Sequence, residues 1–485
     1  MASLCTSNVT SAFIDLATFC EQEKYMYGGP DATAYFVRET RKSTWFTQVP
    51  VVLSRASGNP GFDTEWSVSI SRAGDYLLAA WLRLTTPKVI PNPAVFGPPT
   101  ATNPNANPNL RIRWTRHFMH NLVREACITF NDLVAARFDN YHLDFWTAFT
   151  VPAGKRAGYN NMIGNFSDLT DPHGPAPSAG PFIPSLTLNL PLPFFFTRDS
   201  GVALPTAALP YNDMRINFSF RDWRDLLIVD TIDQTASGDA FSRCAVDNDV
   251  APASQMTLTN VQVWANYAIV SNDERKRMAC APRDILIEQV QTAPRQTFSP
   301  NTDATPRYDI RFSHSIKVFF FSARNTTVRC QWSNYTAGTP VPFTANVNYS
   351  ALAMTDPILQ TSLIYENTNR LSQMGSDYYS LVNPWYHAPF IPLETGYHMY
   401  SYSLDFVCLD PMGSTNYGKL TNVSIVPEAS ADAILSATGG FPSTGQPGFV
   451  APTGGDFPQT WEFVTTAVNN NIIRISGGAL GFPVL

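Results

Sequence analysis

The sequence contains serines, histidines and carboxylates that could act in catalysis or bind metals, but few of them lie in a recognisable catalytic motif. Ser200 follows Arg198 and Asp199 in the run RDSG, the kind of setting in which a nucleophilic serine can occur. The further glycines of such a site are missing, and no histidine lies in a motif that would mark it as the base that activates the hydroxyl. We therefore interpret Ser200 as a turn residue without a catalytic role.

The histidines offer one close pair, His117 and His120, which are three residues apart. Zinc in proteins takes three or four ligands from histidine, cysteine and carboxylate side chains. The chain contains no H-E-x-x-H motif, and no acidic or cysteine partner for this pair is evident in the sequence. The sequence therefore predicts no metal site.

Other catalytic and cofactor motifs are also missing. The run GGPDAT, Gly28 to Thr33, lacks the lysine of a phosphate-binding loop and is better interpreted as a turn before the first strand. Carboxylate pairs for sugar hydrolysis are defined by their distance in space, and nothing in the sequence indicates a particular pair. We expect no enzymatic activity, no cofactor, and no catalytic, cofactor-binding or metal-ligating residues.

The net charge and the cysteines limit the classes of protein to which the chain can belong. A net charge of −6 argues against a dedicated nucleic-acid binder. The short basic clusters at Arg111–His117 and Asp273–Arg277 are better interpreted as a solvated face, a helix end or a subunit contact. No direct nucleic-acid binding is expected. The seven cysteines show no C-x-x-C spacing, which favours free thiols in a reducing compartment. The N-terminus has no secretory signal pattern, and no segment is apolar enough to predict a transmembrane helix.

Composition and pattern predict a β-rich chain that contains one domain twice. Aromatic residues make up 13% of the chain and charged residues only 15%. The alternating segment at Trp66 and the apolar segment that follows it recur at Tyr308, about 240 residues later. CITFNDLVAARFDNYHLDFW is echoed by SLIYENTNRLSQMGSDYYSLVNPW, and VQVWANYAIV by WEFVTTAVNNNIIRI. The same order at similar spacing indicates a tandem duplication.

Prolines and loops limit the length of the strands. Phe194–Phe196, in LPLPFFFTRDSG, are predicted to form a short core strand that prolines keep short. Three segments rich in proline, asparagine and glycine are predicted to be surface loops: 91–109, 171–181 and 437–457. Each half then has about eight strand-like segments, the number in a jelly roll.

The predicted organisation has four parts. Residues 1–27 form an N-terminal arm, 28–270 the first jelly roll, 271–284 a charged, helix-favouring joint, and 285–485 the second jelly roll. Residues Phe13, Leu16, Ala17 and Cys20 have helical spacing, which predicts a short helix in the arm. Two roles stay open for that helix: packing on the protein's own base, or contact with another protein or a membrane surface. The short apolar stripe and the mostly acidic charges favour protein contact over lipid.

Many of these segments resemble the major capsid proteins of iridoviruses and of other nucleocytoplasmic large DNA viruses. The resemblance covers nearly the whole chain, and the main departure is a longer loop at 91–109. It rests on the following stretches: SAFIDLATF, MYGGPDATAYFVRE, SGNPGF, SRAGDYLLAAWL, GYNNMIGN, LPLPFFFTRDSGVALP, LPYNDMRI, DERKRM, EQVQ, LIYENTNRL, YYSLVNPWY, GSTNYGKLTN and NNNIIRISGGALGFPVL.

The resemblance implies an all-β double jelly roll with short helices in loops and at the joint. It further implies a pseudo-hexameric homotrimer that tiles an icosahedral virion shell after synthesis and assembly in the host cytoplasm. The implied partners are neighbouring capsomers and minor capsid proteins, with an internal viral membrane nearby that the chain does not span. The alternatives are a carbohydrate-binding or carbohydrate-active β-sandwich and a minor capsid or spike protein of the same fold.

Overall fold

The computed structural model describes residues 2–18, 43–171, 182–231, 242–338, 355–438 and 458–482. The chain divides into two compact units, residues 1–45 and residues 46–485. The first unit contains helix α1 (Ala2–Ala17), in agreement with the helix predicted near the N-terminus. Both β-sandwiches lie in the second unit.

The first sandwich consists of two antiparallel sheets. One has the order β1-β12-β4-β8 and the other β2-β3-β9-β6-β7. Along β9 (Met214–Phe220) buried and half-buried residues alternate, so one side of the strand faces the core. The other strands are β1 (Phe46–Val52), β2 (Ser54–Ser57), β3 (Glu65–Ser69), β4 (Tyr76–Thr85), β6 (Val123–Phe130), β7 (Leu133–Asp139), β8 (Thr187–Pro191) and β12 (Thr259–Val270). A separate small sheet contains β5 (Leu110–Trp114), β10 (Leu227–Thr231) and β11 (Ser242–Cys244).

The second sandwich repeats this topology, with sheet orders β13-β22-β16-β19 and β15-β21-β17-β18. Each of these strands occupies the place of a strand in the first sandwich, in the same chain order, which confirms the predicted duplication. They are β13 (Arg283–Thr292), β15 (Tyr308–Asp309), β16 (Ser315–Asn325), β17 (Ile358–Tyr365), β18 (Thr368–Gly375), β19 (His398–Ser401), β21 (Val423–Ala429) and β22 (Trp461–Ser476). Three short strands extend the first of these sheets: β14 (Gln296–Phe298), β20 (Thr415–Asn416) and β23 (Ala479–Gly481).

The two hairpins that correspond in the repeat also have the same kind of turn. Asn131 and Asp132, between β6 and β7, have φ angles of 49° and 66°. Glu366 and Asn367, between β17 and β18, have φ angles of 47° and 63°. Two successive left-handed residues twist a two-residue turn to match its strands. The sequence predicted a strand and a polar turn here, and the structure adds a second strand after each turn.

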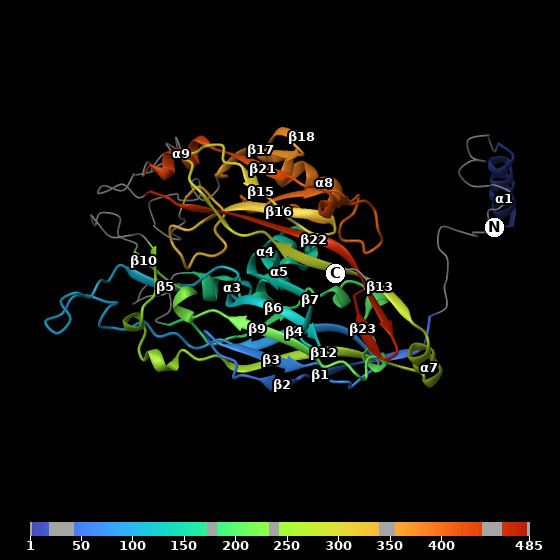
Figure 1. Cartoon of the computed structure of the whole chain (residues 1–485), viewed down its shortest axis with the longest axis horizontal. Helices are drawn as coiled ribbons and strands as arrows, with labels where there is room; N and C mark the ends of the chain where they lie inside the picture. Colours follow the sequence, from blue (N-terminus) through green and yellow to red (C-terminus); the bar gives the residue numbers. More distant parts are fainter. Residues whose placement is uncertain are drawn as a thin grey trace. The chain divides into compact units, whose positions relative to one another are not determined.

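Short helices lie between the two sandwiches and at their edges (Figure 1). In Figure 1 α3, α4 and α5 lie between the strands of the two halves. Two phenylalanine rings of α4 stack on Phe320 of β16 in the second sandwich: the ring centroids are 6.0 Å apart for Phe145 and 5.5 Å apart for Phe149. The helices of the second unit are α3 (Phe118–Leu122), α4 (Asn140–Thr150), α5 (Ala153–Ile163), α6 (Ser167–Thr170), α7 (Asn272–Cys280), α8 (Asn383–His387) and α9 (Ala431–Ala437). In the described part of the chain, no helix combines the length and apolar character needed to cross a membrane.

Strand β16 is buried on both of its faces. Phe319 and Phe321 point into the core of the second sandwich, whereas Val318 and Phe320 belong to the cluster that continues into the first sandwich. A strand covered on both sides must be apolar at successive positions rather than at alternate ones. This explains the run VFFF in its sequence.

The predicted strand at Phe194–Phe196 is wrong, although its burial is confirmed. Residues Phe195–Thr197 form a 3₁₀-helical turn, and all three phenylalanines are at most 2% exposed. Pro191 already ends β8, and Pro193 has no N–H to donate to a neighbouring strand. The chain therefore turns while the rings still fill the core.

Helix α7 lies in the predicted joint, between β12 and β13, and one ion pair attaches it to the first sandwich. Arg275 donates from Nε and Nη2 to the two carboxylate oxygens of Asp75, at 2.8 and 3.0 Å, and Met278 is buried. Burial would raise the pKa of Asp75, but the bonds from Arg275 and the Val270 N–H hold it below its ordinary value.

We expect this anchored joint to resist limited proteolysis of the native protein. A broad-specificity protease should first cut within 91–109 or 437–457, which the sequence predicts to be surface loops. Residues 439–457 lie outside the described part of the chain. Mass spectrometry of the first fragments checks this order. Arg275→Ala should make the joint more susceptible, and rapid cleavage of the unmodified chain beside Arg275 would contradict the prediction.

Candidate functional site

A buried polar cluster lies where the two sandwiches meet. His117 immediately precedes α3, His120 lies within α3, and Asp144 comes from the middle of α4. The backbone of His117 is left-handed, with a φ of 50°. The Asp139 side chain caps α4 by accepting from the N–H of His142 at 2.9 Å. These local conformations bring residues from two helices into one buried site.

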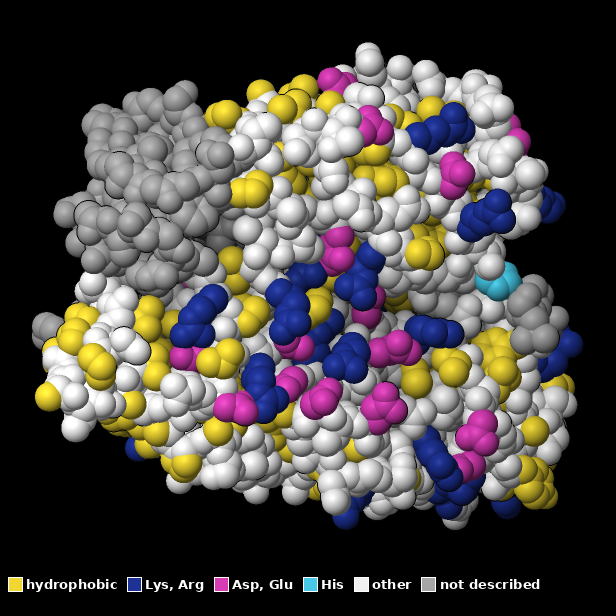
Figure 2. Space-filling view, turned by 60° about the vertical axis from the view of Figure 1, so that its left-hand side comes forward, with side chains coloured by type: hydrophobic (Ala, Val, Ile, Leu, Met, Phe, Trp, Pro, Cys, Tyr) yellow, Lys and Arg dark blue, Asp and Glu magenta, His cyan; other side chains and the backbone are white. Residues whose placement is uncertain are grey.

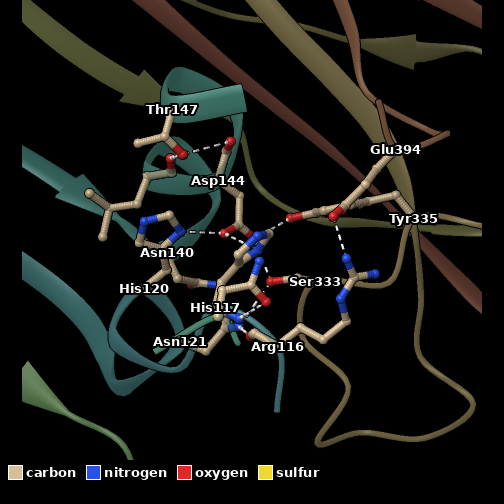
Figure 3. A network of polar contacts seen from close by, with 12 residues as sticks. Arg116, His117, His120, Asn121, Asn140, Asp144, Thr147, Ser333, Tyr335 and Glu394 are labelled. Carbon is tan, nitrogen blue, oxygen red and sulfur yellow. Dashed lines mark hydrogen bonds and ion pairs between the residues drawn. The ribbon is translucent and has the colours of Figure 1, made fainter. Parts of the chain in front are cut away.

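The carboxylate of Asp144 is the centre of this cluster (Figure 3). Its Oδ1 lies 2.8 Å from His120 Nδ1 and 3.6 Å from His117 Nδ1. Its Oδ2 accepts hydrogen bonds from Ser333 Oγ at 2.8 Å and Tyr335 Oη at 3.0 Å. Ser333 and Tyr335 belong to the second half of the chain, so the cluster joins the two sandwiches.

Burial and charge set the protonation of the cluster. Burial would raise the pKa of Asp144, but the His120 bond, the nearby imidazoles and the Ser333 bond together lower it, so the group is a carboxylate. Burial lowers the pKa of His117 to about 4, against the opposing attraction of Asp144 and Glu394. His117 is therefore a neutral imidazole near pH 7. Glu394 forms an ion pair with Arg116 at the edge of the cluster.

Sequence reasoning missed the acidic partner of the two histidines. Asp144 lies 24 residues beyond His120, too far along the chain for a spacing motif. One signal was present: Asp144 is a charged residue in the aromatic run YHLDFW. A carboxylate at a fully buried helix position needs a polar partner, so this run could have indicated one.

The other described residues considered in the sequence analysis lie in turns, in strands or on helix α7. Ser200 is exposed at the start of a 3₁₀-helical turn, and its Oγ donates to Asp199 Oδ1 at 3.4 Å. The run 28–33 lies outside the described residues. Within the cluster at 111–117, the prediction of a solvated face is wrong for Arg113. This arginine is buried on β5 and pairs with Asp230 at 2.5 Å, because β5 packs on both sides. The cluster at 273–277 lies within α7, with Asp273 and Glu274 in its first turn and Arg277 in its last.

The described fold is that of known capsid proteins. The crystal structure of PBCV-1 VP54, fitted into a reconstruction of the virophage Sputnik, superposes with a TM-score of 0.68 at 19% identity over 93% of this chain and 100% of that one. The Faustovirus major capsid protein gives 0.61 at 11% identity over 92% and 93%. Two sandwiches of this topology define the double jelly roll fold.

Sequence comparisons narrow this class to one family. Residues 34–270 match a model described as major capsid protein N-terminus, and 274–481 match the large eukaryotic DNA virus major capsid protein. The chain is 62% identical to the major capsid protein of Costelytra zealandica iridescent virus and 48% identical to that of Lymphocystis disease virus 1, with 100% of each chain covered. The chain belongs to the family of iridescent virus major capsid proteins, which are structural components of the virion capsid.

Proposed function

We propose that three copies of this chain form a pseudo-hexameric capsomer that tiles an icosahedral shell around an internal membrane. The observation that carries the proposal is the repeat: one chain presents two sandwiches with the same strand order, so a trimer presents six. Six similar units around a threefold axis can meet six neighbours, and the differences between the halves fix the orientation.

A mass measurement tests the trimer. Light scattering on purified protein should give three times 53.6 kDa, and electron microscopy of the same sample should show hexagonal outlines. A stable monomer would contradict the proposal. Family membership supports a capsid role over a carbohydrate-binding one. Dominance of the chain in a stained gel of purified virions would separate a main shell protein from a minor or spike protein of the same fold.

We further propose the domain limits 1–27, 28–270, 271–284 and 285–485 for arm, first jelly roll, joint and second jelly roll. Support comes from α7, which follows β12 and ends before β13, and from the two family matches, of which the first ends at residue 270 and the second begins at residue 274. The first residues of β13 fall inside the proposed joint. Neighbouring capsomers and minor capsid proteins are the proposed partners.

The described residues on the face in Figure 2 give no support to direct nucleic-acid binding. Figure 2 shows basic side chains standing among acidic ones on this face, without a continuous basic area. Arg224, for example, pairs with both Asp222 and Asp247. A phosphate backbone requires clustered cations whose charge is not already compensated.

Removing residues 1–25 is expected to leave trimers intact but to impair shell assembly. Val9, Phe13 and Leu16 of α1 are apolar and have helical spacing, which gives the helix a short apolar stripe suited to contact with a minor capsid protein. Gel filtration measures trimer formation, and electron microscopy measures shells. The substitution Asp15→Asn serves as the control. A truncated chain that does not trimerise would contradict this role.

A further inference from the structure

The cluster at Asp144 contains a set of ligand atoms with the spacing of a metal site. His117, His120 and Asp144 each offer one ligand atom, and these three atoms all lie within 4.8 Å of one another. Zinc–ligand bonds of about 2.1 Å place tetrahedral ligands about 3.4 Å apart. The two measured separations from Asp144 Oδ1, 2.8 Å to His120 and 3.6 Å to His117, lie on either side of that value. To hold an ion between them, His120 Nδ1 and Asp144 Oδ1 would move apart from their present 2.8 Å.

His117 supplies the second, independent observation. Its side chain is 9% exposed, and its Nδ1 is buried and has no hydrogen-bond partner among the described residues. A buried ring nitrogen without a partner loses its hydration without compensation. The left-handed backbone of this residue directs the ring into the cluster (Figure 3). Unfavourable backbone geometry at a polar cluster is typical of functional positions.

Outer hydrogen bonds already orient two of the three side chains. His120 Nε2 lies 2.6 Å from Tyr159 Oη. The second oxygen of Asp144 accepts from Ser333 and Tyr335. Metal-binding histidines and carboxylates usually have such outer partners, which fix the ring tautomer and the orientation of the ligand.

We propose that His117, His120 and Asp144 bind one divalent transition-metal ion of the zinc type, with a fourth position left for water or another small ligand. Two nitrogens and one carboxylate oxygen suit zinc better than magnesium or calcium, which prefer oxygen ligands. The ligands come from the first half and the outer partners Ser333 and Tyr335 from the second. The ion therefore stabilises the docking of the two sandwiches. This departs from the sequence analysis, which predicted no metal site because it could not bring Asp144 to the histidines.

Metal content and Co²⁺ spectroscopy on the folded full-length protein test the proposal. After stripping with a chelator, incubation with Zn²⁺ and dialysis, about one Zn²⁺ per chain should remain and raise the melting temperature, since a ligand bound only by the native state stabilises it. Co²⁺ should give the visible absorption of a four-coordinate site. Mg²⁺ should give neither effect.

Two variants and a matched control locate the ion. His117→Asn keeps a residue that tolerates a left-handed backbone, and Asp144→Asn keeps the shape of the side chain. Each should weaken Zn²⁺ binding at least tenfold. His398→Asn alters the separate buried pair His398–Asp356, 2.7 Å apart, and should leave binding unchanged.

Retention of Zn²⁺ by folded His117→Asn or Asp144→Asn would overturn the proposal. So would a folded wild-type chain that holds no stoichiometric Zn²⁺ and shows only octahedral Co²⁺ absorption. If neither variant folds, the metal content and the Co²⁺ spectrum of the wild-type protein are sufficient to test the proposed site.

Discussion

Replacing Trp66 with alanine is expected to lower the free energy of unfolding by about 3–5 kcal/mol. The indole is 3% exposed, stacks on Phe218 at 4.9 Å and meets Phe220 edge-on at 5.5 Å. Alanine would leave a cavity between the sheets of the first sandwich that these rings cannot fill. Urea unfolding and the yield of soluble protein after gel filtration measure the loss.

The same loss is expected for Tyr308→Ala, because Tyr308 begins β15, which takes the place of β3 in the second sandwich. Its ring is 6% exposed and stacks on Phe463 at 4.8 Å, and its hydroxyl donates to the carbonyl of Thr297 at 2.8 Å. Tyr308→Phe should cost only about 1 kcal/mol, the value of one hydrogen bond.

The control for the first sandwich is Trp66→Phe. The indole Nε1 of Trp66 has no hydrogen-bond partner within the described ranges. A phenylalanine therefore keeps most of the stacking and loses no polar contact. If both alanine variants give soluble protein of unchanged stability, the two residues are not the equivalent core positions that the repeat indicates.

The repeat could be predicted because its signal is local. Alternating strands and polar turns depend on neighbouring residues, and their order along the chain shows directly in the sequence. Matching single residues was less reliable. Aligning VQVWANYAIV with WEFVTTAVNNNIIRI at their tryptophans would match Trp264 with Trp461. In the structure Trp264 lies opposite Trp81 of β4, whereas Trp461 lies opposite Asn325 at the end of β16. β22 is longer than β12, so the correspondence of strands does not fix the register.

Contacts across the two halves could not be predicted from the sequence. Phe194–Phe196 and β16 both have apolar runs, yet one forms a 3₁₀-helical turn and the other a strand buried on both faces. The difference depends on Pro193 and on what covers each segment, which only the tertiary arrangement determines. The contact of Asp144 with His117 and His120 also depends on the tertiary arrangement, because it forms only when α4 packs beside α3.

A buried charge network between the sandwiches gives the second large expected effect. Glu288 of β13 accepts from Lys317 Nζ at 2.6 Å, and Arg198 of the first half lies 3.3 Å from its other oxygen. Lys317 is 0% exposed and also donates to the carbonyl of Cys408 at 2.7 Å. The guanidinium of Arg198 stacks on Trp146 at 3.5 Å.

Glu288→Leu should therefore destabilise the protein by about 3–5 kcal/mol, because two buried cations would lose their shared carboxylate. Burial already lowers the pKa of Arg198, and Glu288 opposes that effect, so the arginine would become a still less favourable cation. The midpoint of urea unfolding of the folded protein measures the change.

The double variant Glu288→Leu with Lys317→Met separates the lost attraction from the cost of an unpaired charge. Removing both charges also removes the buried ammonium, so much of the lost stability should return, and Arg198 keeps its stacking on Trp146. If the double variant is no more stable than Glu288→Leu, the loss of stability comes from disturbed packing rather than from an unpaired charge. A single variant as stable as the unmodified chain would mean that water reaches the site.

Because Arg198 and Glu288 come from different sandwiches, recovery of stability in the double variant would also show what holds the two halves together. Apolar contacts, such as those of Phe145 and Phe149 with Phe320, would then be sufficient.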